Sequence, residues 1–210
     1  MEDALLTQLR AGLLRITINR PPLNILDLET LRGLTAALRR AREDRQTRLV
    51  VLTSAGERAF CAGVDIRDHL PGKDAEMIEA VQDNYGAFAE LAAASIPTVA
   101  LVKGLALGGG CELAALCDTL IARDDAEFGL PEIKLGVFPP LAAALFHRRL
   151  TPRVALRLML TGERISAAEA LRVGLAHQVL PANRFHDDAE ELLLMLAMLG
   201  KTGKEKPAGG

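Results

Sequence analysis

The chain has 210 residues, enough for one domain with a helical appendage. Half of the residues are apolar and a quarter are charged, so a large core can form. The 25 basic and 27 acidic residues leave a net charge of −2 at pH 7, which excludes a bulk electrostatic attraction to nucleic acid or to anionic lipid. Only 3% of the residues are aromatic and tryptophan is absent, which argues against base stacking as a main binding device.

The cysteines and the apolar runs indicate the cellular compartment of the protein. Three cysteines without disulfide spacing predict reduced thiols and a cytoplasmic protein. Residues 1–10 open with acidic residues and lack the apolar stretch of a signal peptide. The apolar run at 192–199 is far shorter than the roughly 20 residues needed to cross a bilayer. We therefore expect no membrane association.

The first third of the chain alternates predicted strands and a helix. Residues 13–19 alternate apolar and polar side chains, which predicts a strand. The prolines at 21 and 22 end it, because proline has no donor for the ladder. Apolar residues at three- and four-residue spacing predict a helix over 28–41, with Asp27 as its N-cap. A short apolar strand is expected at 49–53.

The middle third repeats this alternation. A loop of small residues at 54–65 precedes a helix predicted at 74–94. A buried strand is expected at 98–102, and a glycine-rich turn at 104–110 leads into a short helix. Another strand is expected at 119–123. Strands that alternate with helices predict an α/β fold.

The last third is predicted to be helical. Pro152 suits a first helical turn, and Ser166 with Glu169 forms a capping-box pattern. A last helix is expected at 185–199, and its apolar run at 192–199 should be buried between subunits, because a monomer would expose part of it. The predicted parts of the chain are a core at 1–180, a helical region at 181–199 and a flexible tail at 200–210.

Three segments carry residues that suit carbonyl chemistry: AFCAGVD at 59–65, GLALGGGCE at 104–112 and FGLPEIKLGVFPP at 128–140. In the first two, small residues follow a strand, so no Cβ keeps a ligand away from the main chain. Two backbone N–H groups from different loops can then bind one carbonyl oxygen. Glu112 or Glu132 alone could be a helix-dipole or solvated carboxylate, but the ordered set favours catalysis.

Other kinds of site fit less well. The glycines at 104–110 match neither a dinucleotide fingerprint nor a P-loop. Ser54 lies in no nucleophile elbow, and Cys111 is more simply a small buried thiol. No metal site is predicted, because the histidines lack ligand spacing. These histidines are His69, His147, His177 and His186.

The segments GLALGGGCEL and FGLPEIKLGV, with TGERISAAEALRVGL at 161–175, resemble the enoyl-CoA hydratase/isomerase family, also called the crotonase family. The resemblance extends over about 13–180. It implies an α/β spiral of ββα units, here with a shortened C-terminal helical region. The implied partner is an acyl-CoA thioester, with no separate cofactor because coenzyme A is part of the substrate. The implied assembly is a homotrimer or a dimer of trimers.

The same resemblance implies roles for individual residues. The N–H groups of Val64 and Gly109 would form an oxyanion hole, and Glu112 and Glu132 would be the paired carboxylates. Adding water across a conjugated C=C needs both an acid and a base, as well as donors for the enolate oxygen. The residues implied at the adenine end of coenzyme A are Ala62, Asp65 and Ile66.

Several functions fit this pattern. Two carboxylates favour a hydratase, whereas a Δ3–Δ2 enoyl-CoA isomerase would need only one. A non-catalytic acyl-CoA-binding subunit is the alternative from another class. The run PEIKLGVFPP resembles the subset that hydrates cyclohexa-1,5-dienecarbonyl-CoA in aromatic degradation. Pro140 stands where the family usually has glycine, and it removes a backbone donor beside the expected pocket.

Overall fold

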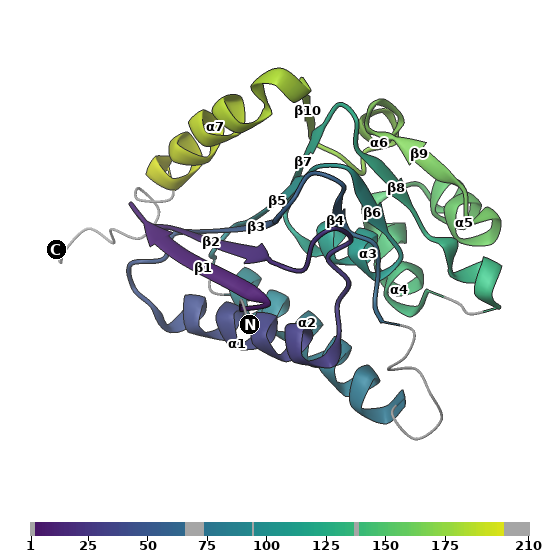
Figure 1. Cartoon of the computed structure of the whole chain (residues 1–210), viewed down its shortest axis with the longest axis horizontal. Coiled ribbons are helices and arrows are strands. Elements are labelled where there is room, and N and C mark those ends of the chain that lie inside the picture. The colour runs from purple at the N-terminus through teal and green to yellow at the C-terminus, as the bar shows by residue number, and fades with distance from the viewer. Residues whose placement is uncertain (1–2, 66–73, 94, 137–138, 200–210) are drawn as a thin grey trace, which may run out of the picture.

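The computed structural model describes residues 3–65, 74–93, 95–136 and 139–199. Within these residues the chain forms two β-sheets, of six and four strands (Figure 1). The larger sheet contains, in spatial order, β1 (Leu5–Arg10), β2 (Leu13–Ile18), β3 (Leu49–Ser54), β5 (Thr98–Val102), β7 (Thr119–Arg123) and β10 (Gln178–Leu180). The smaller sheet contains β4 (Ala59–Cys61), β6 (Leu105–Leu107), β8 (Glu127–Gly129) and β9 (Arg164–Ser166).

Consecutive strands divide between the two sheets. β3 joins the larger sheet, β4 joins the smaller, and α2 (Asp74–Ala93) follows. The pattern recurs as β5, β6 and α3 (Gly109–Leu116), and again as β7, β8 and α4 (Pro140–Arg149). Neighbouring strands of successive units pair in parallel within each sheet. The predicted spiral of ββα units is confirmed.

The central strands of the larger sheet are buried on both faces, which explains why they are continuously apolar. Val50 and Leu52 of β3 face the core that contains α1 (Leu28–Glu43) and α3. Leu49 and Val51 face the opposite side, against α7 (Phe185–Leu199). Figure 1 shows α7 on one side of this sheet and α1 with α2 on the other.

The helix signals that depend on single residues are mostly confirmed. The N–H of Thr30 donates to the Asp27 carboxylate at 2.9 Å, which caps α1. Pro152 occupies the first turn of α5 (Pro152–Thr161). The short helices are α6 (Ala167–Val173) and the 3-10 helices η2 (Pro131–Leu135) and η3 (Ala182–Arg184). Among the helices described here, none combines the length and apolar character that a membrane span requires.

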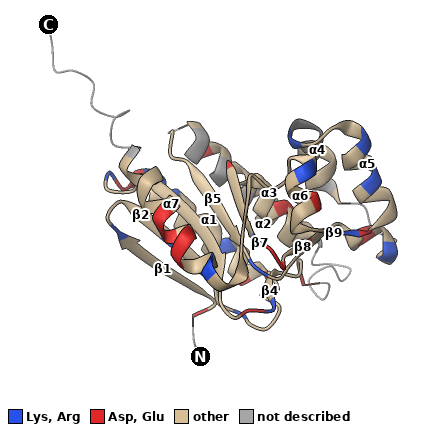
Figure 2. Ribbon diagram, turned by 90° about the horizontal axis from the view of Figure 1, so that it is seen from above, with Lys and Arg blue, Asp and Glu red and all other residues tan. Residues whose placement is uncertain are grey.

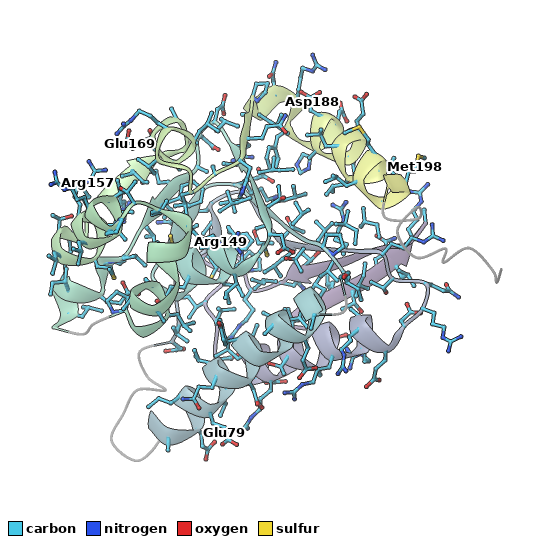
Figure 3. All side chains as sticks on the ribbon, turned by 180° about the vertical axis from the view of Figure 1, so that it is seen from behind. Glu79, Arg149, Arg157, Glu169, Asp188 and Met198 are labelled. Atoms are coloured by element: carbon cyan, nitrogen blue, oxygen red, sulfur yellow. The ribbon has the colours of Figure 1, made fainter. Side chains whose placement is uncertain are left out.

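The capping box at the start of α6 is only half formed. The N–H of Glu169 donates to the hydroxyl oxygen of Ser166 at 3.2 Å, as expected. The carboxylate of Glu169 turns away from Ser166 and pairs with Arg157 of α5 at 3.1 Å and with Arg172 at 2.6 Å. Arg157 and Glu169 are labelled in Figure 3. Two nearby guanidinium groups compete for a carboxylate better than one backbone donor does.

Six strands were not predicted: β1, β4, β6, β8, β9 and β10. β1 pairs with β2 through a two-residue turn in which Ala11 and Gly12 both have positive φ, the conformation of a type I′ hairpin. Its side chains are mostly exposed, so no apolar alternation marks it. β4 and β6 lie inside the segments predicted as a loop and a turn. Like β8, β9 and β10, each has three residues, too few for a periodic pattern to be recognised. Because β9 and β10 lie in the last third of the chain, the expectation that this third is helical throughout is wrong.

The apolar run at 192–199 divides between two environments. Leu193 and Ala197 are buried against the larger sheet, at 0% and 3% exposure. Leu194, Met195 and Met198 are exposed on the other side of α7, and Figure 3 labels Met198. The expectation that the whole run is buried between subunits is therefore wrong, because one face already packs within the chain. The tail predicted at 200–210 lies outside the described residues.

Candidate active site

The main chain after β4 presents Val64 to the site. Leu26 donates its N–H to the carbonyl oxygen of Gly63 at 3.0 Å and accepts the N–H of Asp65 at 2.9 Å. These bonds form an isolated parallel bridge between Leu26 and Val64. In this bridge Leu26 bonds to Gly63 and Asp65, the residues on either side of Val64. Val64 itself makes no bond to Leu26, so its N–H points away from Leu26, to the other side of its strand.

On that other side lies Gly109, the first residue of α3. A Cβ added to Gly109 would lie 3.6 Å from the nitrogen of Val64 and 2.8 Å from its Cγ2. In the part of the chain that the structure describes, neither N–H has an acceptor. The first N–H groups of a helix have no partner within it. Two free donors from different loops can therefore converge on one oxygen.

Each glycine of the run at 108–110 is required by a different neighbour. Gly108 has φ 54° and ψ −129°, and a Cβ there would lie 2.9 Å from Oε1 of Glu132. A Cβ on Gly110 would lie 2.2 Å from the carbonyl oxygen of Cys61. Together with Gly109 against Val64, this run brings α3, β4 and η2 into contact at one point.

Glu112 is buried in the first turn of α3, with 5% exposure. Its Oε1 accepts the N–H of Ala142 at 2.7 Å. Burial raises the pKa of Glu112 to about 7, and the negative charge of Glu132 acts in the same direction. The N–H groups of Ala142 and Leu141 oppose the rise. Because Pro140 has no N–H, these are the first two free donors of α4, and Glu112 caps that helix from α3.

Glu132 lies in η2 with one oxygen against Gly108. Its other oxygen, Oε2, is buried without a hydrogen-bond partner among the described residues. Burial raises the pKa of Glu132, and only its own backbone N–H opposes the rise. A buried carboxylate oxygen without a partner is costly in free energy, so this group favours the protonated form or a bound ligand.

A cavity of about 40 Å³ adjoins the two N–H groups, which is room for about two water molecules. Val64 and Gly109 line it, and Glu112 supplies its polar side chain, whereas Glu132 is not part of its lining. The remaining side chains of the lining are all aliphatic: Leu26, Leu31, Val81, Leu113, Leu116 and Leu141. The arrangement can hold an apolar group next to a bound carbonyl.

The structure brings Val64, Gly109, Glu112 and Glu132 to one place, as the family resemblance implies. Ala62 precedes Val64 by two residues, and Asp65 follows it directly and is buried at 8% exposure. Ile66 lies outside the described residues.

Three residues considered unsuited to catalysis on sequence grounds are buried or hydrogen-bonded within the fold. The Cys111 thiol is buried and burial raises its pKa, so it is an unreactive thiol. The hydroxyl of Ser54 donates to the carbonyl oxygen of Ala59 at 3.1 Å. Nδ1 of His177 accepts the N–H of Leu120 at 3.0 Å.

Sequence reasoning missed two groups that shape the site. Ala142 holds Glu112 through its N–H, which no side-chain pattern can show. Asn24 is fully buried and hydrogen-bonded in the loop before α1. A possible signal was its type, since asparagine adopts positive φ more readily than most residues, and φ is 50° here.

Comparisons with known proteins identify the family of the chain. A sequence profile of the enoyl-CoA hydratase/isomerase family matches residues 8–203. Carnitinyl-CoA dehydratase from Proteus mirabilis is 36% identical over 203 residues, which cover 94% of this chain and 76% of that protein. Probable enoyl-CoA hydratase echA8 from Mycobacterium tuberculosis is 42% identical over 173 residues, and the match covers 80% of this chain and 65% of the relative.

Solved structures show the same fold. An enoyl-CoA hydratase from Bacillus anthracis superposes with a TM-score of 0.84 at 32% identity, covering 93% of this chain and 77% of that one. An enoyl-CoA hydratase from Mycobacterium avium subsp. paratuberculosis superposes with a TM-score of 0.85 at 32% identity, covering 95% and 82%. The chain therefore belongs to the enoyl-CoA hydratase/isomerase family and is an enzyme of the hydratase and dehydratase kind.

Proposed function

We propose that this protein catalyses the reversible addition of water across the C=C bond conjugated to an acyl-CoA thioester. One observation carries the proposal: the free N–H groups of Val64 and Gly109 lie beside the carboxyl groups of Glu112 and Glu132, both with raised pKa values. Such donors stabilise the negative charge that a thioester oxygen gains during addition, each by roughly 3 kcal/mol.

The reaction divides between the two carboxyl groups. Ionised Glu112 takes a proton from water while the water oxygen bonds to the β-carbon. The π electrons move onto the thioester oxygen, which accepts the N–H groups of Val64 and Gly109. Protonated Glu132 then gives its proton to the α-carbon as the enolate collapses. Proton exchange between the two groups restores the starting state, and dehydration follows the reverse course.

The surroundings of each carboxyl group support this division. The N–H groups of Ala142 and Leu141 donate to Glu112 and favour its ionised form, which suits a base. Glu132 has a buried oxygen without such a donor, which favours the protonated form and suits an acid. The assignment of base and acid rests on these hydrogen-bond partners, because burial raises the pKa of both groups and brings that of Glu112 to about 7.

The cavity bears on the acyl group. Apart from Glu112, which is assigned to proton transfer, its lining is aliphatic. This lining favours an uncharged hydrocarbon chain over the trimethylammonium group of carnitinyl-CoA, because such cations are usually held by aromatic faces. A linear enoyl group fits this preference. An alicyclic dienoyl group also fits it, and the run PEIKLGVFPP supports that choice. We assign the adenine end of coenzyme A to Ala62, Asp65 and Ile66, and the protein to the cytoplasm.

The mechanism is tested by removing each proton-transferring group. Glu112→Gln and Glu132→Gln should each lower the turnover of crotonyl-CoA hydration roughly 10²–10⁴-fold. Affinity for a CoA thioester should change little, since neither carboxyl group is assigned to the nucleotide. Glu191→Gln, the same change on the exposed face of α7, is the control and should have normal turnover.

Near-normal hydration by either variant would disprove the paired mechanism. If Glu132→Gln abolishes hydration but retains double-bond isomerisation, the protein is an isomerase. If the native chain binds the thioester and turns nothing over, it is a binding subunit.

The acyl preference is tested with a panel of thioesters. Initial rates should be measured for linear enoyl-CoA, cyclic dienoyl-CoA and carnitinyl-CoA, with product analysis. We expect the two hydrocarbon classes to give the higher kcat/KM. A higher kcat/KM for carnitinyl-CoA would contradict the argument from the aliphatic lining.

A further inference from the structure

Asn24 lies in the loop between β2 and α1, and none of its surface is exposed. Its Nδ2 group donates to the carbonyl oxygens of Ala55 at 2.9 Å and Ala59 at 2.8 Å. Its Oδ1 accepts the N–H of Arg20 at 2.9 Å. The side chain therefore joins this loop to both ends of the turn between β3 and β4.

The backbone of Asn24 reverses the chain at this point. Its φ of 50° is left-handed, and its N–H donates to the carbonyl oxygen of Arg20 at 2.8 Å. Asparagine tolerates this conformation better than most residues do. The reversal sends the next residues alongside the segment that follows β4.

This loop fixes the main chain around Val64 from both sides of Asn24. Before it, the carbonyl oxygen of Leu23 accepts the N–H of Ala62 at 2.9 Å. After it, Leu26 makes the parallel bridge to Val64. The direction of the Val64 N–H thus depends on where the loop lies, and the buried amide of Asn24 fixes the loop to the turn before β4.

We infer that Asn24 is a positioning residue that aims the N–H of Val64 into the oxyanion hole. The inference rests on the proposed function, because the Val64 N–H that Asn24 positions is a donor of the proposed oxyanion hole. A hydrogen bond to a developing oxyanion weakens steeply when its angle or length changes. A small shift of the loop should therefore lower the rate of the chemical step while the thioester still binds.

Two variants and two matched controls test this inference. Asn24→Gly keeps the left-handed backbone accessible and removes the amide. Asn24→Asp keeps the shape but places carboxylate oxygens against the carbonyl groups of Ala55 and Ala59. Asn19→Gly and Asn19→Asp are the controls, because the Nδ2 group of Asn19 also donates to a backbone carbonyl oxygen, that of Asp3 at 3.0 Å. Asn19 lies at the start of the same loop, and among the described residues its side chain makes no hydrogen bond to the turn before β4.

The decisive readout is the carbonyl stretching band of a bound enoyl-CoA thioester, measured by isotope-edited infrared spectroscopy. Glu132→Gln serves as the background, so that the substrate stays unreacted. The band should move to lower frequency on binding, and Asn24→Gly should remove at least half of that movement. Asn19→Gly should leave it unchanged. With Glu132 present, Asn24→Gly should lower kcat on the order of tenfold or more with little change in KM.

The outcomes separate the inference from the proposed function. If the Asn24→Gly chain binds the thioester with an undiminished band shift, Asn24 is not a positioning residue, whatever happens to the melting temperature. If neither Asn24 variant folds, the residue acts in stability alone and the inference is overturned. If the band does not move even with Asn24 intact, the oxyanion hole and the proposed function fail first.

Discussion

Burial governs the chemistry of Glu112. The carboxyl group loses most of its hydration inside the protein, and burial raises its pKa from an ordinary value of 4.5 to about 7. A base with a pKa near the working pH is ionised often enough to act and is still basic enough to take a proton from water. The same burial lowers the stability of the fold at neutral pH, since the ionised form is the one that burial disfavours.

The free energy of unfolding should therefore depend on Glu112. The folded chain binds this proton more tightly than the unfolded chain, so the stability it contributes is complete below pH 4.5 and is lost as pH rises through about 7. The loss should approach about 3 kcal/mol. Glu112→Gln cannot ionise and should lack this component. Urea unfolding of both chains at pH 5 and pH 8 measures it, and equal pH dependence in the two chains would contradict it.

Gly109 tests the oxyanion hole. A Cβ there would lie 2.8 Å from Cγ2 of Val64, so Gly109→Val should force the two donors apart. Hydration should slow by roughly two powers of ten. Gly109 begins α3 and does not lie in a free loop, so some stability should also be lost. The control is Gly86→Val in α2, where an added Cβ meets nothing within 4 Å among the described atoms. Unaltered activity in folded Gly109→Val would place the carbonyl elsewhere.

Among the elements, α7 shows what the sequence pattern determines and what packing determines. Its first turn is acidic, with Asp187 and Asp188, which suits the positive end of the helix dipole, and Figure 2 shows acidic positions along it. Glu190 pairs with Arg15 of β2 and holds the helix to the sheet. The apolar run predicts a helix that must be covered, and the sheet decides which face is covered.

Two truncations on α7 should separate those faces. Leu193 is fully buried against the sheet, so Leu193→Ala should lower the free energy of unfolding by about 2–5 kcal/mol. Met198 is 65% exposed, so Met198→Ala should change it by less than about 0.5 kcal/mol. Chemical denaturation measures both. Similar losses in the two variants would mean that α7 is not oriented as described.

At the scale of the whole molecule, the exposed apolar face of α7 bears on assembly. Leu194, Met195 and Met198 stay exposed to solvent in a single chain, and a subunit contact would cover them. The homotrimer or dimer of trimers implied by the family resemblance would supply such a contact, and it stays a prediction. The division of the chain into a core and a helical region at residue 180 also stays a prediction. In the structure α7 packs directly on the larger sheet.

The native mass in solution should therefore be a multiple of the 22.5 kDa chain. Multi-angle light scattering at micromolar concentration measures it. The double substitution Leu194→Asp with Met198→Asp should lower the mass, because two charges cannot be buried in an apolar contact. Leu6→Asp on β1 is the control, since Leu6 is exposed to a similar extent, 46% against 43% for Leu194. A stable monomer of the native chain would contradict the prediction.

The sequence by itself determined the main helices, the longer buried strands and the chemical types at the site. Apolar periodicity defined α1, short apolar runs defined β5 and β7, and the capping residue Asp27 defined where α1 begins. The glycine run and the two glutamates could be recognised from residue type alone. Glycine lets a ligand approach the main chain, and a carboxylate can act as an acid or a base. The short strands β4 and β6 could not, since three residues carry no period.

Only the tertiary structure decided which of these groups meet. The contact of Glu112 with the N–H of Ala142 joins residues 30 apart, and the position of Gly109 beside Val64 joins two different ββα units. The raised pKa of Glu112 and the support of Val64 by Asn24 follow from burial. Burial and distance between remote segments arise from the packing of both sheets together. A local sequence pattern indicates the conformation of its own segment, but it does not show how remote segments pack against each other.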